Sequence, residues 1–244
     1  MTFRACAVVP TYDNPRTVGA VVEELARHVP AVIVVDDGSG AEGRAAVDDL
    51  VSRGLAVLRR HERNRGKGAA VKTALVAARE LGFTHALQVD ADGQHDLKDV
   101  PRFLEAAKAA PGSVVLGEPV FDASVPPARL RGRKVSVFWT TLETGSRIIR
   151  DPLCGFRVYP VEAALRAGAR GNRMEFDPEI AVRLAWAGTP VLNLPTRVRY
   201  LAPEEGGVSH FRMFRDNAWI SWGHTRLCTL AVLRALLGRG RRRT

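Results

Sequence analysis

The stretch Ala31-Val32-Ile33-Val34-Val35-Asp36-Asp37-Gly38-Ser39 passes from five apolar residues directly into two carboxylates and a turn. A short apolar run of this kind is typical of a buried strand in a parallel sheet. The same pattern occurs at Ala5–Pro10 before Thr11-Tyr12-Asp13, and at Ala86–Val89 before Asp90-Ala91-Asp92-Gly93-Gln94-His95. Ligands of open α/β sheets bind at the carboxyl ends of the strands, so these three segments predict one site.

Helical periodicity alternates with the strand-like runs through the first half of the chain. Two further strands are expected at Leu55–Arg59 and Ser113–Leu116. The expected helices are Thr17–His28, Ala41–Ser52, Gly68–Leu81 and Leu97–Ala109. This alternation predicts an α/β fold, with a Rossmann-like, mostly parallel sheet and helices on both of its faces.

The second half of the chain has a different pattern, which begins near residue 126. Its expected elements are a helix at Val135–Ile149, a loop and strand at Asp151–Pro160, a helix near Asp177–Ala187, a strand at Val191–Arg199 and a helical stretch at Ser209–Leu237. We therefore expect a main domain over 1–208, made of halves 1–125 and 126–208. Basic amphipathic C-terminal helices would form an extension over 209–244.

The charge is divided unevenly between the two halves of the chain. The 244 residues carry a formal net charge of +10, and 46% of them are hydrophobic, which excludes a disordered chain. Residues 1–128 hold 15 Lys and Arg against 17 Asp and Glu, a net of −2, whereas residues 129–244 hold 21 against 9, a net of +12. The second half is thus expected to meet an anionic partner: nucleic acid, a membrane surface or a phosphorylated ligand.

The chain shows no sign of export, of a membrane span or of a disulfide framework. Cys6, Cys154 and Cys228 are widely spaced and form no CxxC pair, which favours a reducing compartment. We find neither a signal peptide nor a window of 18 uncharged apolar residues. A cytoplasmic protein, soluble or peripheral on a membrane, is expected.

Three phosphate- or metal-binding loops can be tested on the residues, and none of them fits. Gly66-Lys67-Gly68-Ala69-Ala70-Val71 lacks the third small residue of a dinucleotide fingerprint, and His61 stands where a P-loop needs its first glycine. A calcium loop starting at Asp90 would need glycine at His95 and glutamate at Pro101. Asp90 and Asp92 instead offer hard oxygen ligands to Mg²⁺ or Mn²⁺, with open positions for a diphosphate.

Seven sequence blocks resemble one enzyme family. The first four are Val8-Val9-Pro10-Thr11-Tyr12, Val34-Val35-Asp36-Asp37-Gly38-Ser39, Asn64-Arg65-Gly66-Lys67-Gly68 and Asp90-Ala91-Asp92-Gly93-Gln94-His95. They resemble the nucleotide-sugar signatures of family 2 glycosyltransferases with the GT-A fold. The later three are Cys154-Gly155-Phe156-Arg157, Phe176-Asp177-Pro178-Glu179 and Gly207-Val208-Ser209-His210. These resemble the polyprenyl- or dolichyl-phosphate mannose and glucose synthase branch, without the C-terminal transmembrane helices of many members.

The resemblance implies a set of roles for the matching residues. The donor, a GDP- or UDP-hexose, would be bound by Pro10, Thr11, Asp13, Asp36, Asp37, Arg63, Lys67, Asp90, Ala91 and Gln94. Asp90 and Asp92 would bind the metal. Catalytic roles would fall to Asp92, Asp177, Glu179 and Arg157. The acceptor phosphate would be bound by Arg129, Arg131, Arg199, Ser209 and Arg212.

The implied reaction is the inverting transfer of a hexose to a lipid-linked acceptor. A hydroxyl acceptor needs a base, for which Asp177 or Glu179 is the candidate, whereas a phosphate is already ionised and needs cations. The basic second half favours a polyprenyl phosphate, and the alternative is a hydroxyl of another lipid or of an aromatic acceptor. His210 and Cys154 depart from the residues usual in the branch and leave the acceptor open.

The basic C-terminal stretch favours a membrane surface over nucleic acid as the anionic partner. Phe211, Phe214, Trp219 and Trp222 share one helix-like run with arginines, which favours an anionic membrane surface, although the same faces could simply pack on the domain. A basic nucleic-acid-binding protein is the remote alternative, because the aromatic residues do not lie on a sheet or a recognition helix. No nucleic acid partner is therefore expected. The sequence contains no signal for an oligomeric state.

Overall fold

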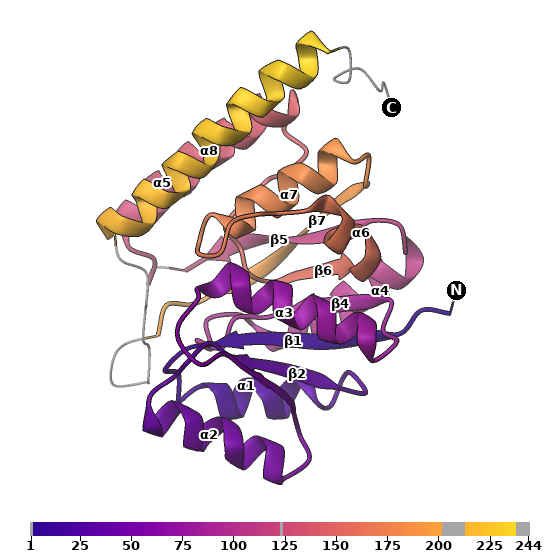
Figure 1. Cartoon of the computed structure of the whole chain (residues 1–244), viewed down its shortest axis with the longest axis vertical. Helices are drawn as coiled ribbons and strands as arrows, with labels where there is room; N and C mark the ends of the chain where they lie inside the picture. Colours follow the sequence, from indigo (N-terminus) through magenta and orange to yellow (C-terminus); the bar gives the residue numbers. More distant parts are fainter. Residues whose placement is uncertain (1, 123, 202–212, 238–244) are drawn as a thin grey trace.

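The computed structural model describes residues 2–122, 124–201 and 213–237, and a seven-stranded sheet forms its centre (Figure 1). Its strands are β1 (Ala5–Thr11), β2 (Val32–Asp36), β3 (Val57–Arg60), β4 (His85–Gln88), β5 (Val114–Phe121), β6 (Arg157–Pro160) and β7 (Val191–Val198). Their order is β3-β2-β1-β4-β6-β5-β7. Neighbouring strands are parallel, except that β6 runs antiparallel to β4 and β5. The predicted mostly parallel sheet is confirmed.

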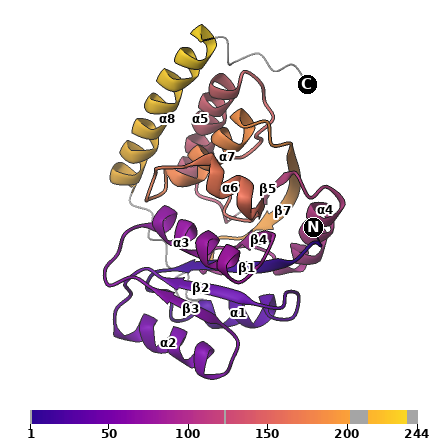
Figure 2. The same cartoon turned by 45° about the vertical axis from the view of Figure 1, so that its right-hand side comes forward.

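Helices cover both faces of this sheet. They are α1 (Val18–Leu25), α2 (Ala41–Ser52), α3 (Lys67–Glu80), α4 (Val100–Ala109), α5 (Pro127–Thr144), α6 (Val161–Ala167), α7 (Phe176–Trp186) and α8 (Met213–Leu236), with a 3-10 turn at Leu97–Asp99 before α4. One apolar core includes residues of α1, α2 and α4, and a second includes residues of α3, α6 and α7. Figure 2 shows α1 and α2 on one side of the strands and α3, α6 and α7 on the other.

The fifth helix differs from the range that the sequence predicts. It begins at Pro127 rather than Val135 and ends at Thr144 rather than Ile149. Proline suits the first turn of a helix, where its missing N–H is not needed. Gly145, with φ of 71°, adopts the left-handed conformation that ends a helix. Apolar periodicity alone had suggested neither of these boundaries.

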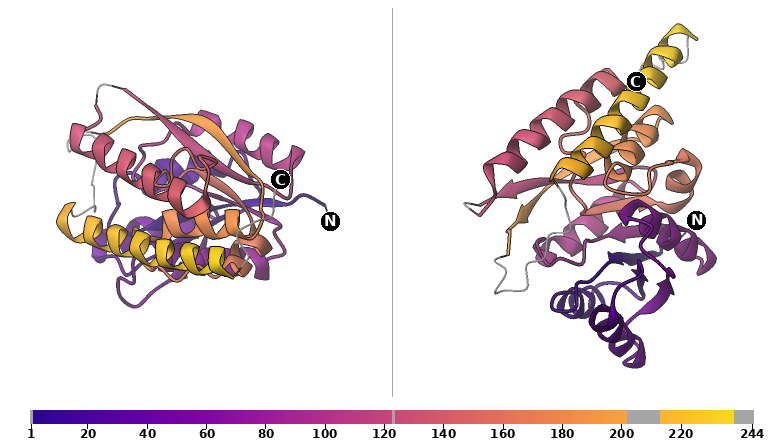
Figure 3. Two further views of the ribbon diagram at one scale, coloured as in Figure 1. Left: turned by 90° about the horizontal axis from the view of Figure 1, so that it is seen from above. Right: turned by 60° about the vertical axis from the view of Figure 1, so that its left-hand side comes forward.

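The last helix packs beside α5 rather than standing apart from the domain. Figures 1 and 3 show α8 and α5 side by side and running in the same direction, away from the sheet. Large apolar side chains of both helices remain exposed, among them Val135, Phe138, Leu142, Trp219 and Trp222. Among the helices of the described ranges, none is long and apolar enough to cross a membrane. The first residues of the expected C-terminal stretch, 209–212, lie outside the described residues.

The antiparallel strand β6 begins with an arginine that is wholly buried. Arg157 donates hydrogen bonds to the carbonyl oxygens of Pro152 and Cys154, both at 2.6 Å, and of Asp177 at 2.7 Å. These bonds fasten the loop before β6 to the start of α7. The catalytic role implied for Arg157 does not fit this position, because the chain's own carbonyl groups take up its donors. We therefore correct it to a structural role.

Replacing Arg157 tests this correction. In Arg157→Met the three carbonyl oxygens lose the hydrogen bonds of the buried guanidinium, so we expect the free energy of unfolding in urea to fall by about 3 kcal/mol or more. The control is Arg166→Met, because this arginine is exposed and pairs with Glu162 on the surface of α6. Its expected loss is below about 1 kcal/mol. Equal, small losses in both variants would contradict a structural role for Arg157.

Candidate functional site

The acidic loop Asp90–His95 follows β4 and is held from two sides. The hydroxyl of Thr17, just before α1, donates to the carbonyl oxygen of Ala91 at 2.6 Å. On the other side, the backbone N–H of Arg199, just after β7, donates to the carbonyl oxygen of Gln94 at 3.0 Å. The carboxylates of the loop therefore project from a backbone that is fixed to both halves of the chain.

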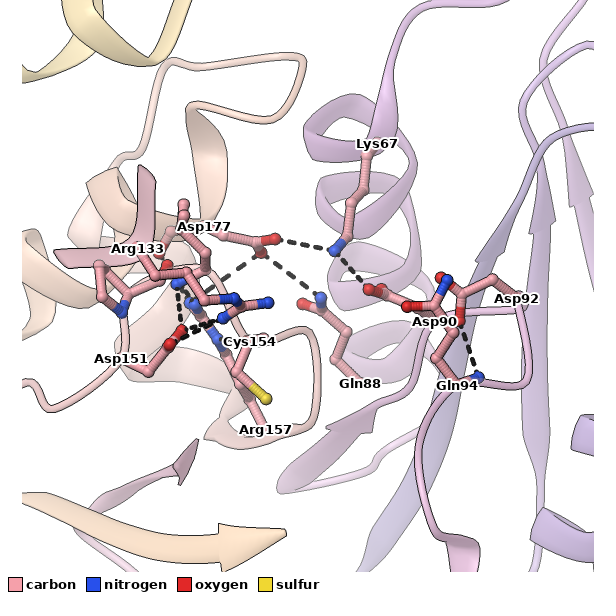
Figure 4. Close-up of polar contacts among 12 residues, drawn as sticks. Lys67, Gln88, Asp90, Asp92, Gln94, Arg133, Asp151, Cys154, Arg157 and Asp177 are labelled. Atoms are coloured by element: carbon pink, nitrogen blue, oxygen red, sulfur yellow. Dashed lines mark hydrogen bonds and ion pairs between the residues drawn. The ribbon is translucent and has the colours of Figure 1, made fainter. Parts of the chain in front are cut away.

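Lys67, the first residue of α3, joins two carboxylates that are far apart in the sequence. Its Nζ lies 2.8 Å from Asp90 Oδ2 and 2.8 Å from Asp177 Oδ2, and Figure 4 shows it between them. Burial disfavours the charge of this ammonium group, yet the attraction of Asp177 and Asp90 raises the pKa of Lys67 above its usual value. Gln88 Nε2 also donates to Asp177, at 3.5 Å.

The pair Asp90 and Asp92 has the properties expected of a cation site. Burial opposes the charge of Asp90, but Lys67 lowers its pKa, whereas burial and the charge of Asp90 raise the pKa of Asp92 to about 6. Asp90 Oδ1 is buried and has no hydrogen-bond partner among the described residues. A Cβ at Gly155 would collide with the Asp90 carboxyl group, so a larger residue there would displace that carboxylate. The two carboxylates therefore fit a hard divalent cation.

A cation at this site would need ligands from outside the protein. Across the described ranges there is no group of three or more His, Cys, Asp and Glu side chains placed to hold a metal. Mg²⁺ in proteins is commonly bound by one or two carboxylates together with substrate phosphates. The donor set of Asp90 and Asp92 matches this open arrangement.

A cavity of about 220 Å³ lies next to the carboxylates. Six residues predicted for the site line it: Lys67, Asp90, Asp92, Gln94, Arg129 and Asp177. Residues without a predicted role that also line it include Asn14, His95, Arg133, Ser136, Tyr200, Asn217 and Ile220. The cavity therefore combines the acidic end of the sheet with the side chains of α5 and α8.

Two arginines of α5 face this cavity from one side of the helix. Arg129 and Arg133 are one helical turn apart and both line it, whereas Arg131 is exposed and does not. Arg133 Nη1 lies 2.6 and 2.7 Å from the two carboxylate oxygens of Asp151. The guanidinium of Arg129 lies 5.1 Å from the ring centre of Tyr200. Arg133, rather than the predicted Arg131, therefore shares the cavity side of α5 with Arg129, and the helical spacing i, i+4 is the signal that identifies it.

The acidic residues at the ends of β1 and β2 form a second cluster, outside the cavity. Asp37 Oδ1 contacts His61 Nδ1 at 2.6 Å, and its carboxylate accepts the backbone N–H groups of Arg65 and Gly66 at 2.9 and 2.7 Å. Asp36 is wholly buried and pairs with Arg60 at 2.7 Å. Both residues, predicted to contact the donor, fix loops that lead to Lys67.

Apart from Ala91, which belongs to the acidic loop, the other predicted donor residues surround this second cluster. Asp13 accepts the backbone N–H of Gly40 at 2.7 Å, and Thr11 is buried at the end of β1 beside Pro10. Arg63 is exposed, and its backbone packs so closely on Gly38 that a Cβ there would collide with it. Ala91 is buried between Asp90 and Asp92. The ends of β1, β2 and β3 therefore meet at one place, whereas the single site predicted at the ends of β1, β2 and β4 stays a prediction.

Glu179 does not reach the cavity. It is wholly buried in α7, where its carboxylate accepts the N–H of Gly171 at 2.7 Å and pairs with Arg183 at 2.7 Å and Arg226 at 2.6 Å. Its predicted role as a base is corrected, because these partners occupy both oxygens. Asp177 is the α7 carboxylate that lines the cavity.

The remaining predicted residues belong to the acceptor set. Arg199 is exposed and contacts the acidic loop through its backbone. Ser209 and Arg212 lie outside the described residues. His95, which carried no predicted role, lines the cavity with its Nδ1 buried and unpartnered in the described part of the chain. Burial lowers the pKa of His95 to about 4, so its ring is neutral near pH 7.

Known proteins match both the sequence and the fold. The sequence profile of glycosyl transferase family 2 matches residues 6–166. A UDP-N-acetylglucosamine–dolichyl-phosphate N-acetylglucosaminyltransferase of Methanococcus voltae is 25% identical, over 69% of this chain and 74% of its own. An undecaprenyl-phosphate mannosyltransferase of Micrococcus luteus is 33% identical, over 44% of this chain and 46% of its own.

A solved structure supports the assignment of the fold. Glucosyl-3-phosphoglycerate synthase of Mycobacterium tuberculosis, crystallised with Mn²⁺, UDP and glucosyl-3-phosphoglycerate, superposes with a TM-score of 0.68. The match covers 93% of this chain and 80% of that chain, at 16% sequence identity. At this identity the likeness concerns the fold, and the predicted GT-A fold is confirmed.

The carboxylate pair can be tested by metal binding alone. In Asp92→Asn one of the two hard ligands loses its charge, so we expect the affinity for Mn²⁺ to fall more than about tenfold, measured by isothermal titration calorimetry. Asp49→Asn is the matched control, because Asp49 is an exposed aspartate that pairs with Arg53 on α2. Mn²⁺ affinity that is the same in both variants would show that the pair is not the cation site.

Proposed function

This chain belongs to glycosyl transferase family 2, and on that premise we propose that it moves a hexose from a nucleotide diphosphate sugar to a polyprenyl phosphate. One observation carries the proposal: a single cavity has two carboxylates on one side and two arginines of α5 on the other. A cation and a diphosphate suit the first side, and an acceptor phosphate suits the second. The relatives named for transfer to dolichyl and undecaprenyl phosphate support this acceptor class.

The donor is proposed to bind across the carboxyl ends of β1, β2 and β4. Its nucleoside would lie near Thr11, Asp13 and Arg63, with Asp36 and Asp37 holding the surrounding loops, and either a guanine or a uracil nucleotide is compatible. Asp90 and Asp92 would hold Mg²⁺ or Mn²⁺, which neutralises the charge that develops on the departing diphosphate. Gln94 lines the cavity beside them and would face the sugar.

The transfer itself is proposed to be a direct displacement with inversion. A phosphate oxygen of the acceptor forms a bond to the anomeric carbon as the bond from that carbon to the diphosphate oxygen breaks. The electron pair of the broken bond leaves with the nucleoside diphosphate, and Arg129 and Arg133 hold the attacking phosphate in line. Its second pKa is roughly 6, so the phosphate is mostly dianionic near pH 7 and no base is required. A hydroxyl acceptor would need one, and Asp177 is the candidate in the cavity.

The acceptor class implies a place for the enzyme at a membrane surface. The exposed apolar side chains of α5 and α8, including Phe138, Leu142 and Trp222, are suited to the headgroup boundary of a bilayer. The net charge of +12 in the second half would favour an anionic leaflet, since each nearby basic residue contributes about 1 kcal/mol. We therefore propose a peripheral enzyme on the cytosolic face of the membrane.

Transfer to a lipid phosphate can be assayed directly. Anionic vesicles containing undecaprenyl phosphate are incubated with the protein, Mn²⁺ and either a UDP- or a GDP-hexose, and lipid products are identified by mass spectrometry. We expect a polyprenyl phosphohexose with one of the donors. Transfer to soluble hydroxyl acceptors, with none to the lipid phosphate, would overturn the proposal in favour of the hydroxyl alternative.

The role of the α5 arginines can be separated from that of the donor site. In Arg129→Met one charged contact to the acceptor phosphate is lost, so we expect kcat/KM for the lipid to fall about 10- to 100-fold. Donor affinity, measured by calorimetry, should change little. Lys134→Met removes an exposed positive charge from the same helix and serves as the control. An equal fall in both variants would point to general charge attraction rather than to this contact.

A further inference from the structure

The wall of the cavity opposite the sheet depends on how α8 sits against α5. Arg129, Arg133 and Ser136 of α5 line the cavity, and so do Asn217 and Ile220 of α8. Figures 1 and 3 show that these two helices lie side by side over much of their length. A rotation or a slide of α8 would therefore change the shape of the cavity.

Apolar packing alone does not account for the face that α8 turns inward. Its buried stripe contains the polar or small residues Asp216, Gly223 and His224, together with Ile220 and Leu227. Larger apolar side chains point outward instead: Trp219 is 43% exposed, Trp222 60%, Val232 59% and Leu233 49%. Burying the tryptophans would remove more apolar surface from water, so another contact must select the observed orientation.

A buried hydrogen bond between the two helices provides such a contact. His224 Nδ1 lies 2.8 Å from Glu143 Oε1, and both residues are only 3% exposed. The thiol of Cys228 lies 3.7 Å from the same carboxylate oxygen. The indole N–H of Trp186, in α7, donates to the carbonyl oxygen of Glu143 at 2.8 Å. The ring of Trp139 stacks on His224 at 6.4 Å and completes the enclosure.

Stability alone does not explain this buried pair. Neither Glu143 Oε2 nor His224 Nε2 has a hydrogen-bond partner within the described residues, and an unpartnered buried polar atom costs free energy. Apolar residues of similar size are often as stabilising as a buried polar pair. The best-attested benefit of such a pair is that it fixes the register of two helices.

The register of α8 at His224 also sets the position of the α8 residues that line the cavity. Ile220 precedes His224 by four residues and Asn217 by seven, so all three lie on one stripe of the helix. A slide of α8 by one helical turn, about 5.4 Å, would place Glu143 against a non-matching side chain and would move Ile220 and Asn217 off the cavity. Arg226, paired with Glu179 of α7 at 2.6 Å, restrains α8 on its other side.

We propose that Glu143 and His224 form a positioning clasp, which fixes the register of α8 on α5 and thereby places Asn217 and Ile220 in the wall of the acceptor cavity. The clasp acts through those two residues and touches no substrate itself. The change expected in KM for the lipid rests on the proposed function, whereas the position of α8 on α5 does not.

The decisive variant replaces the polar pair by an apolar one. Glu143→Leu combined with His224→Leu should leave the midpoint of urea unfolding close to that of the unmodified chain. We expect KM for undecaprenyl phosphate in vesicles to rise about 10- to 100-fold, because a cavity wall displaced by an ångström or more positions the acceptor poorly. Donor affinity should stay unchanged. Glu143→Gln, which keeps an acceptor for the imidazole, should retain most of the acceptor affinity.

His28→Leu is the matched control, because His28, just after α1, contacts Glu24 of that helix at 3.1 Å and so forms a partly exposed pair of the same residue types. It should alter neither stability nor KM. An acceptor KM in the double leucine variant equal to that of the unmodified chain would overturn the clasp. So would parallel losses of stability, donor affinity and acceptor affinity, since these are expected of a merely structural contact.

A distance measurement tests the register without any activity. Nitroxide labels at Phe138→Cys and Trp222→Cys, both exposed positions, are introduced in a chain carrying Cys228→Ser. Pulsed electron spin resonance should give one narrow distance distribution, which shifts or broadens when the two leucines are added. An unchanged distribution would overturn the clasp. If the distribution responds but the unmodified enzyme transfers nothing to the lipid, the proposed function fails and the clasp stands.

Discussion

The ammonium group of Lys67 is the contact on which the rest of the cavity depends. It lies 2.8 Å from Asp90 at the end of β4 and 2.8 Å from Asp177 in α7, so it joins the two halves of the chain. Each of these charges is costly to bury without a partner. The three side chains must therefore come into place together, which fixes α3, the acidic loop and α7 relative to one another. Asp37 supports the arrangement by holding the backbone of Arg65 and Gly66, just before Lys67.

Lys67 and its two carboxylates lie where two halves of very different net charge meet. Residues 1–128 have a net charge of −2 and residues 129–244 a net charge of +12, and the cavity lies where the two meet. On one side Asp90 and Asp92 are suited to a cation and a diphosphate. On the other, Arg129 and Arg133 are suited to a second phosphate. In a member of glycosyl transferase family 2, this arrangement supports the proposed transfer between two phosphorylated substrates.

The features that the sequence predicted best are those that depend on local residue patterns. Apolar runs ending in carboxylates identified the strands and the acidic edge of the sheet, and the range expected for Ala41–Ser52 agrees with α2. Patterns of residue type could not reveal which polar groups the fold would bury. Arg157 and Glu179 looked suited to chemistry, yet their partners are carbonyl, amide and guanidinium groups of the chain itself. Arg133 could have been chosen over Arg131, because helical spacing places it on the face of Arg129.

The bridge between the halves is tested most directly by a double-mutant cycle on Lys67 and Asp177. Free energies of unfolding in urea are measured for Lys67→Met, for Asp177→Asn, for the variant with both changes and for the unmodified chain. If Lys67 binds the two halves together, the losses in the two single variants should add up to more than the loss in the double variant. The difference, which is the coupling energy, should be about 1–3 kcal/mol. Losses that add to within about 0.5 kcal/mol would contradict it, because the two residues would then act independently.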